Sequence, residues 1–175
     1  MKIAFNEVQR FRVWWAWTGV IVLNALFIYA FVQQVIMGIP FGNKPASNLT
    51  LTLIETGPLL LLFFLFSVKL KTSYDDAGIH YRYFPFQLRT IHIGWDELND
   101  AYIRKYNSFH EFGGWGIRTG SAKKGNAVNT SESSDQGLQL QFSNGKLLLI
   151  GTKDPAAIQQ LLDGVFAAGL INRKV

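Results

Sequence analysis

Few residues in this sequence could perform acid–base or metal chemistry. There are three histidines and no cysteine, which excludes disulfides, zinc–thiolate sites, iron–sulfur clusters and cysteine nucleophiles. His80 and His92 lie in two neighbouring predicted strands, whose alternating apolar residues place both imidazoles on the outward face. A protein zinc site needs three or four ligands, and Asp96 is roughly 13 Å further along the strand than His92. We therefore interpret both histidines as surface residues and expect no metal site.

The remaining motif fragments do not complete a catalytic site. His110 and Glu111 begin like the zinc motif His-Glu-x-x-His, but Phe-Gly-Gly follows and the second histidine is missing. The sequence contains no Gly-x-Ser-x-Gly and no phosphate loop ending in Gly-Lys-Ser/Thr. The glycines of Gly-Gly-Trp-Gly (113–116) provide backbone freedom beside a bulky Trp115. The sequence therefore predicts a protein that is not an enzyme and uses no cofactor.

Charge is distributed unevenly along the chain. The net charge is +5, with six Lys/Arg against two acids in residues 1–71 and eleven against ten in residues 72–175. Nucleic-acid-binding domains concentrate basic residues on a soluble face, whereas the excess here accompanies the apolar half. We therefore expect no nucleic-acid partner, and we interpret the basic residues as signals of membrane topology.

Two long apolar stretches predict a membrane hairpin within residues 1–71. Residues 13–37 carry no charge and begin with a tryptophan cluster (14, 15 and 17) typical of a membrane interface. The stretch is longer than the apolar core of a signal peptide, which has about 7–15 residues. Residues 49–70 contain a purely apolar run after Pro58. Because a helix needs about 20 apolar residues to cross a bilayer, we expect spans at about 13–37 and 49–70.

The positions of the basic residues predict the orientation of this hairpin. Five of them flank its two ends, whereas the connecting loop at 38–48 contains only Lys44. Cytoplasmic segments are enriched in Lys and Arg, so both termini are expected in the cytoplasm. The flanking residues are Lys2, Arg10 and Arg12 before the first span, and Lys69 and Lys71 after the second.

Glu55 is the one acidic residue in the apolar stretches. It lies about six residues, or roughly 9 Å of helix, from the outer end of its span. Gln33 and Gln34 lie at a similar depth and could form hydrogen bonds with its carboxylate. We expect an intramembrane polar contact among these three residues and favour an interfacial or pair-satisfied Glu55 over a functional carboxylate.

The second half of the chain alternates apolar and polar residues, which predicts strands at 79–84, 90–95, 98–106, 115–119 and 126–130. Asn144-Gly145 is the preferred sequence of a two-residue type I′ hairpin turn, so Gln139 and Gln141 are expected on the outer face. The same turn predicts the inward pairs Phe142 with Leu147, Leu140 with Leu149, and Leu138 with Gly151.

A final helix is predicted from its caps and its apolar stripe. Asp154 is placed to be the N-cap, Pro155 to be the first helical residue, and Gly169 to end the helix. The stripe has helical spacing and consists of Ile158, Leu161, Leu162, Val165 and Phe166.

About seven short antiparallel strands followed by one capping helix is the plan of the pleckstrin-homology-like (PH-like) superfold. Over nearly its whole length the chain resembles an uncharacterised family of bacterial membrane-anchored PH-like proteins. The resemblance rests on two N-terminal spans and on the phrases Phe-Pro-Phe (84–86), Trp-Asp-Glu-Leu (95–98), Tyr-Ile-Arg-Lys-Tyr (102–106) and Gly-Gly-Trp-Gly-Ile-Arg (113–118). It implies a membrane α-helical hairpin and a cytoplasmic α+β, mostly β, PH-like domain at 72–175. It implies a multi-pass protein of the bacterial inner membrane, and no reaction or ligand.

The loop after the first predicted strand is unusually apolar for a turn. Two interpretations are open. Apolar tips flanked by arginines suit insertion at a membrane surface, but the same side chains could instead fill the core of the domain or pack on its helix, which is the interpretation we favour. The residues concerned are Arg82, Phe84, Phe86, Leu88 and Arg89.

These observations favour a non-enzymatic integral membrane protein that presents a PH-like binding or scaffold domain at the cytoplasmic membrane face. Its expected partners are the lipid bilayer and either another protein or further copies of itself. The alternative is a subunit of a membrane complex whose functional part is the hairpin, with Asn24, Gln33, Gln34 and Glu55 at helix contacts. A lipid-modifying enzyme is disfavoured because no nucleophile, base and metal ligands converge.

Overall fold

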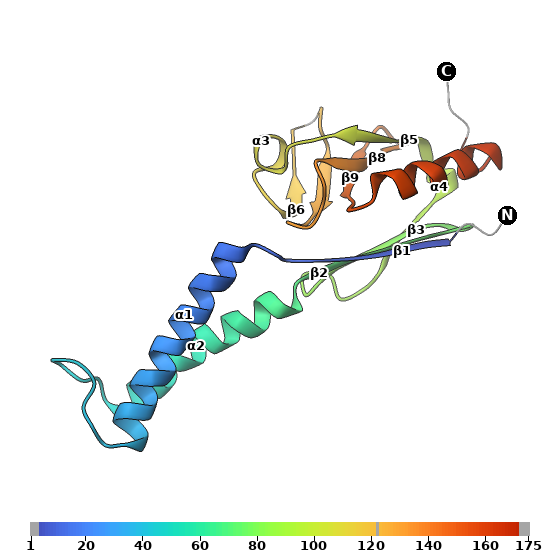
Figure 1. The fold of residues 1–175 in the computed structure, drawn as a ribbon. Coiled ribbons are helices and arrows are strands. Elements are labelled where there is room, and N and C mark those ends of the chain that lie inside the picture. Colours follow the sequence, from blue (N-terminus) through green and yellow to red (C-terminus); the bar gives the residue numbers. More distant parts are fainter. Residues whose placement is uncertain (1–3, 122, 172–175) are drawn as a thin grey trace. The chain divides into compact units, whose positions relative to one another are not determined.

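The computed structural model describes residues 4–121 and 123–171 and divides the chain into two compact units (Figure 1). One unit is Arg12–Ser67. The other joins the N-terminal segment up to Phe11 to the chain from Val68 onward. The N-terminal segment thus belongs to the β-rich unit, although the sequence assigns it to the helical one, and the boundaries lie at 11/12 and 67/68.

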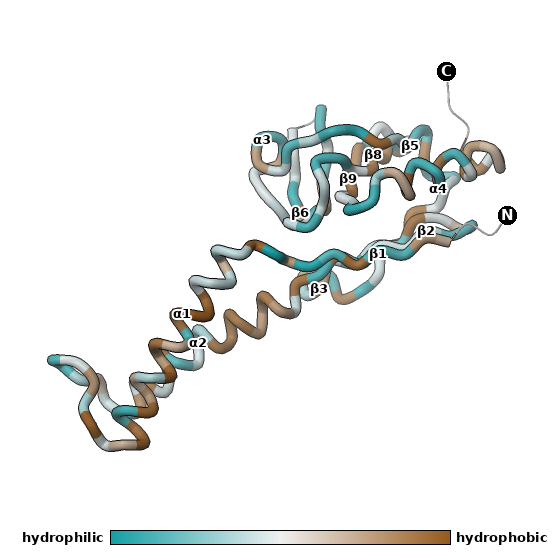
Figure 2. The backbone as a smooth tube through the Cα atoms, in the orientation of Figure 1, coloured by the Kyte–Doolittle hydropathy of each residue, from teal (hydrophilic) through white to brown (hydrophobic). Residues whose placement is uncertain are grey.

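The helical unit consists of two helices packed against each other. They are α1 (Trp14–Phe31), which continues into a π-helical turn η1 (Val32–Ile36), and α2 (Asn48–Ser67). Both are long and apolar enough to cross a membrane, and only 22% and 11% of their most apolar windows are buried. Apolar residues recur along both helices (Figure 2), and large apolar side chains such as Leu26 and Phe63 are exposed, unlike those of a helix whose apolar stripe covers a core.

The β-rich unit contains two sheets. The first is antiparallel, with strands in chain order. In the second sheet, a central hairpin lies between strands from other parts of the chain, and the strands Asn126–Asn129 and Leu147–Gly151 are parallel to each other. The first sheet contains β1 (Ala4–Arg10), β2 (Lys69–Asp75), β3 (Gly78–Phe84) and β4 (Ile91–Gly94). The second contains, in spatial order, β5 (Leu98–Lys105), β8 (Gln136–Phe142), β9 (Leu147–Gly151), β7 (Asn126–Asn129) and β6 (Gly116–Thr119).

The described residues therefore form nine strands, where the sequence predicts about seven, and one of the pairings is parallel. All five strands predicted singly and both strands of the predicted hairpin are present. The two additional strands, β1 and β2, flank the helical unit in the chain. They pair with each other, so that Arg10 is opposite Lys69 and Phe5 is opposite Tyr74. The helical hairpin is thus an insertion between two adjacent strands.

The main core lies between the two sheets and beneath α4 (Pro155–Ala167). The predicted helix caps are confirmed: the Asp154 carboxylate accepts a hydrogen bond from Ala157 N (2.9 Å), and Gly169 adopts φ +69°. The apolar stripe of α4 faces the core, with Leu161 and Phe166 at its margin. Fully buried members of this core include Leu70, Ile79, Leu138, Leu140, Ile150, Ile158, Leu162 and Val165.

The β8–β9 register differs by one residue from the prediction. Phe142 N donates to Lys146 O and Gly145 N to Phe142 O, both at 2.9 Å, so the loop contains three residues, with Gly145 at φ +81°. A type I′ turn needs positive φ at both central residues. Asn144 does not adopt positive φ, and a three-residue loop with a left-handed glycine forms instead. Leu140 therefore pairs with Leu148, and Leu138 with Ile150.

Gln139 points to the face opposite Leu140, as expected, but the prediction that this face is open to solvent is wrong. Gln139 pairs with Leu149, and only 2% of Gln139 is exposed. The second face of the five-stranded sheet is covered by a short helix, α3 (Ser108–Phe112), with a small cluster of Tyr106, Phe112, Ala127 and Leu149. The Gln139 amide oxygen accepts a hydrogen bond from Arg104 Nε (2.8 Å). Both faces of this sheet are therefore buried near β8.

Candidate functional site

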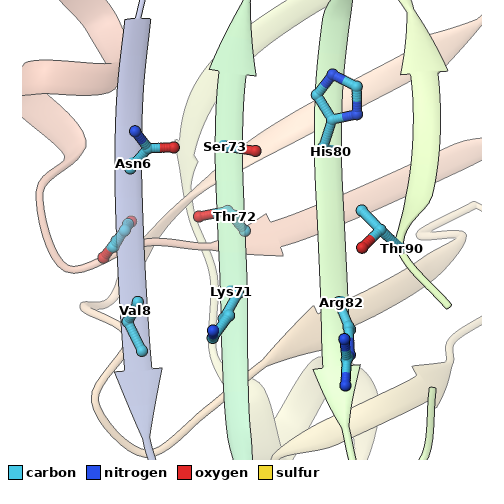
Figure 3. A pocket seen from close by; sticks show the side chains of 9 residues that line it. Asn6, Val8, Lys71, Thr72, Ser73, His80, Arg82 and Thr90 are labelled. Carbon is cyan, nitrogen blue, oxygen red and sulfur yellow. The ribbon is translucent and has the colours of Figure 1, made fainter. Parts of the chain in front are cut away.

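The outward face of the four-stranded sheet carries the basic residues Arg10, Lys69, Lys71 and Arg82 on one regular surface. Along β1, β2 and β3, buried and more exposed residues alternate, so every second side chain points away from the core. The outward residues form rows across the sheet (Figure 3). By register these rows are Asn6–Ser73–His80–His92, Val8–Lys71–Arg82 and Arg10–Lys69–Phe84.

Two hollows lie on this face. The larger has a volume of about 300 Å³ and the smaller about 140 Å³. Lys71 and Arg82 line both of them, so these two side chains stand between the hollows. Outward residues at the larger one are Asn6, Val8, Lys71, Ser73, His80, Arg82 and Thr90, and the smaller one is lined by Lys69, Lys71, Arg82 and Phe84.

The basic residues are arranged unfavourably for a surface that only faces water. Lys71 is the direct register partner of Arg82, and Arg10 is that of Lys69. Like charges directly opposite in a sheet are destabilising. In the described part of the chain, no carboxylate forms an ion pair with Lys69, Lys71 or Arg82. The sheet therefore holds excess positive charge on this face.

Contacts near Arg82 orient its guanidinium but leave hydrogen-bonding capacity unused. Its Cζ lies 5.3 Å from the Phe84 ring centroid, and Lys69 Nζ lies 5.5 Å from the same centroid. Arg82 Nε is buried and makes no hydrogen bond. Glu7 also lines the larger hollow, but its carboxylate is bonded to Thr152 Oγ1 (2.8 Å) and Lys153 N (2.6 Å).

The two strand histidines lie on the outward face, as predicted, and the structure makes them neighbours there. His80 pairs with His92, and their Nδ1 atoms are 3.3 Å apart. His80 Nε2 lies 3.0 Å from Asp75 Oδ2. Burial opposes ionisation of Asp75, but hydrogen bonds from Ala77 N and Gly78 N, together with His80, lower its pKa. Within residues 4–121 and 123–171, no group of three or more His, Asp or Glu side chains could hold a metal ion.

The apolar loop after β3 exposes two of its apolar side chains. Phe86 and Leu88 are 63% and 72% exposed, so the core-filling interpretation is wrong for both. The core position is taken by Tyr83, which is 3% exposed and has its ring 5.6 Å from that of Phe86. The loop is held by a hydrogen bond from Gln87 N to Tyr83 O (2.7 Å). Arg89 is also exposed, which leaves this loop with two apolar tips and a cation.

Glu55 is buried between the two helices, but the expected polar contact is absent. The Gln34 amide donates to Ala46 O (2.6 Å) and Asn48 Oδ1 (3.0 Å), and thereby ties down the connecting loop. No hydrogen bond joins Gln33 or Gln34 to Glu55 in the described residues, and both carboxylate oxygens of Glu55 lack a partner. Glu55 borders a cavity of about 310 Å³ lined by Ile28, Phe31, Thr52, Thr56 and Leu59.

The remaining motif fragment has a structural role. Glu111 lies in α3, where its carboxylate accepts hydrogen bonds from Asn107 N (3.0 Å) and Arg104 Nη1 (2.9 Å). Burial opposes ionisation of Glu111, but these bonds and the charges of Arg104 and Lys124 lower its pKa. Asn107 caps the same helix through its side chain. This cluster fixes α3 over Gln139.

A polar connection between β1 and the second sheet is not apparent from the sequence. Gln9 is fully buried and donates to Gly151 O (2.7 Å). Its amide oxygen accepts from Thr130 Oγ1 (3.0 Å) and Ser133 Oγ (2.6 Å). Together with the bonds of Glu7, these contacts anchor the N-terminal strand. The only sequence signal is the alternation of two polar residues with Val8.

Comparison with protein-family models, curated proteins and solved structures finds no match to this chain.

Proposed function

We propose that this protein is a non-enzymatic integral membrane protein of the bacterial inner membrane, which presents a PH-like binding or scaffold domain to the cytoplasm. The observation that carries the proposal is the insertion of two apolar helices between the paired strands β1 and β2. Two sheets around a common core with a C-terminal helix are compatible with the PH-like plan suggested by the sequence.

The strand pairing supports the proposed topology independently of the charge rule. Arg10 and Lys69 are register partners, so the chain must enter and leave the bilayer on the same side, which two complete crossings achieve. Basic residues at both ends favour the cytoplasmic side. We therefore place both termini in the cytoplasm and the loop 38–48 outside.

This topology can be tested with single cysteines, because the chain has none of its own. Asn43→Cys in the loop and Ser143→Cys in the β8–β9 turn are both at exposed or partly exposed positions. A membrane-impermeant maleimide applied to cells with a permeabilised outer membrane should label Asn43→Cys at once. It should label Ser143→Cys only after the inner membrane is opened. Immediate labelling of Ser143→Cys would contradict the proposal.

The second candidate function places the partner site in the helical hairpin. It is favoured by one observation, the buried and unpartnered carboxylate of Glu55 beside a cavity. A donor from another membrane helix would satisfy that carboxylate. If Glu55→Leu abolishes a cross-linked complex that Phe86→Ser and Lys71→Gln leave intact, the hairpin is the partner-binding part.

A further inference from the structure

We propose that the outward face of the four-stranded sheet binds the phosphate group of an anionic phospholipid, held between Lys71 and Arg82. The lipid as the source of the phosphate rests on the proposed membrane location. The binding site itself rests on charge, hydrogen-bonding capacity and shape.

The opposed positive charges on this face favour the binding of an anion. Lys71 and Arg82 are directly opposed, at a Cβ separation of about 5 Å in such pairs, and neither forms an ion pair with a carboxylate of the described residues. Arg10 and Lys69 form a second opposed pair in the next row. An anion between Lys71 and Arg82 would replace repulsion with two charge-assisted hydrogen bonds.

The surroundings supply donors that suit a phosphate group. The buried Arg82 Nε has no acceptor. Ser73, Thr90 and Asn6 line the same hollow and place two hydroxyl groups and an amide around it (Figure 3). The phosphate of a phospholipid is a diester whose two charged oxygens can each accept more than one hydrogen bond, so it can use several of these donors at once. The hollow of about 300 Å³ corresponds to roughly ten water molecules of liquid, which is enough for a phosphate with its glycerol.

Position in the chain favours a lipid over a soluble phosphate. Arg10 is four residues before the start of α1, and Lys69 is two residues after the end of α2. The row Arg10–Lys69–Phe84 therefore follows directly in the chain from the two proposed membrane spans. At the same end of the sheet, Phe84 is opposite Lys69, and the following loop exposes Phe86 and Leu88. Cations beside exposed apolar tips match the boundary between head groups and acyl chains.

The test uses the full chain in uncharged maltoside micelles. Short-chain phosphatidylglycerol, short-chain phosphatidylcholine and glycerol 3-phosphate are titrated in turn, and heat of binding is recorded. We expect phosphatidylglycerol to bind at least tenfold more tightly than phosphatidylcholine, whose choline neutralises the phosphate charge. The double variant Lys71→Gln/Arg82→Gln should weaken binding roughly 30-fold, from about 1 kcal/mol per cation.

The matched control is Lys105→Gln/Lys146→Gln, which removes two exposed charges elsewhere on the same unit and should change the affinity by less than about threefold. Equal losses in both double variants, or no preference for phosphatidylglycerol, would overturn the site. Equal affinity for glycerol 3-phosphate, with the same loss in Lys71→Gln/Arg82→Gln, would overturn the lipid and assign the site to a soluble phosphate ester.

Stability provides a second readout. Because Lys71 and Arg82 repel each other, Lys71→Gln/Arg82→Gln should unfold at the same temperature as the wild type or a higher one. A lower unfolding temperature would contradict the unfavourable pairing. The titrations and the unfolding measurements depend neither on the orientation of the protein in the membrane nor on a protein partner. The cysteine-labelling experiment alone tests the topology, so a failure of the topology can be distinguished from a failure of phosphate binding.

Discussion

Truncation of Gln9 should release the N-terminal strand from the rest of the β-rich unit. Gln9→Ala removes three hydrogen bonds, to Gly151 O, Thr130 Oγ1 and Ser133 Oγ. It also leaves Thr130, which is 1% exposed, with one partner fewer. At about 0.5–1.5 kcal/mol for each bond, the expected loss is roughly 3 kcal/mol. A loss of this size increases the population of the detached strand roughly 100-fold.

Hydrogen exchange of the full chain in detergent measures this population directly. The backbone N–H groups of β1 and their partners in β2 should exchange roughly 100-fold faster in Gln9→Ala when exchange follows the opening equilibrium. The matched control is Asn6→Ala, which truncates an amide side chain on the same strand but on the exposed face. It should change exchange less than about threefold.

Two results would refute this reasoning. Equal acceleration by Asn6→Ala and Gln9→Ala would mean that strand propensity, and not the buried amide, holds β1. Unchanged exchange in Gln9→Ala would mean that β1 is held without Gln9, by its pairing with β2 and by the hydrogen bonds of its other residues. Faster exchange confined to β1 and β2, with the peptides of β8 and β9 unchanged, would show that the loss is local.

Three further predictions concern other parts of the fold. Gln139→Asp and Leu140→Asp should each lower the unfolding temperature of the β-rich unit strongly, because burying the new carboxylate costs several kcal/mol. A wild-type unfolding temperature in either variant would contradict the burial of β8 on both faces. Glu111→Gln should destabilise the protein by about 1–3 kcal/mol at neutral pH. Since the folded pKa of Glu111 lies below its ordinary value of 4.5, its contribution is present above about pH 4.5 and is lost as the pH falls through the folded pKa, so wild-type and Glu111→Gln denaturation midpoints should converge in acid. Phe86→Ser should leave the melting temperature within about 1–2 °C of the wild type, because a surface substitution changes stability by less than about 0.5 kcal/mol, and should weaken binding to anionic vesicles; an unfolded variant would restore the core-filling interpretation of this loop.

Elements with local signals could be predicted from the sequence. The caps Asp154 and Pro155 define the last helix, and the alternation of apolar residues in β3 and β4 places His80 and His92 together on the outer face. Local signals also explain the error at the β8–β9 turn. Asn-Gly suits a two-residue loop, but Gly145 alone suffices for a three-residue loop, and the choice depends on how the strands pack on both faces.

The remaining strands have no local sequence signal, because distant residues supply the hydrogen bonds of their buried polar side chains. The inward side chains of β1 include Glu7 and Gln9, which look solvent-exposed in the sequence and are buried only because residues 130–153 supply their hydrogen bonds. From the sequence alone, Lys71 is only a topological signal at the end of an expected span. Its position opposite Arg82 depends on the β2–β3 pairing, so the candidate site could not be assembled without the fold.

The insertion of the helical hairpin also affects when β1 and β2 can pair during folding. The residues between Arg10 and Lys69 number 58 (11–68). At a synthesis rate of about 5–20 residues per second, β2 is therefore made roughly 3–12 s after β1. Closing a flexible loop of that length would cost roughly 3–4 kcal/mol of chain entropy. If the two helices associate in the bilayer first, their ends are already close and most of that entropy is lost before the strands meet. The lipid bilayer would then act as a template for a sheet that forms outside it.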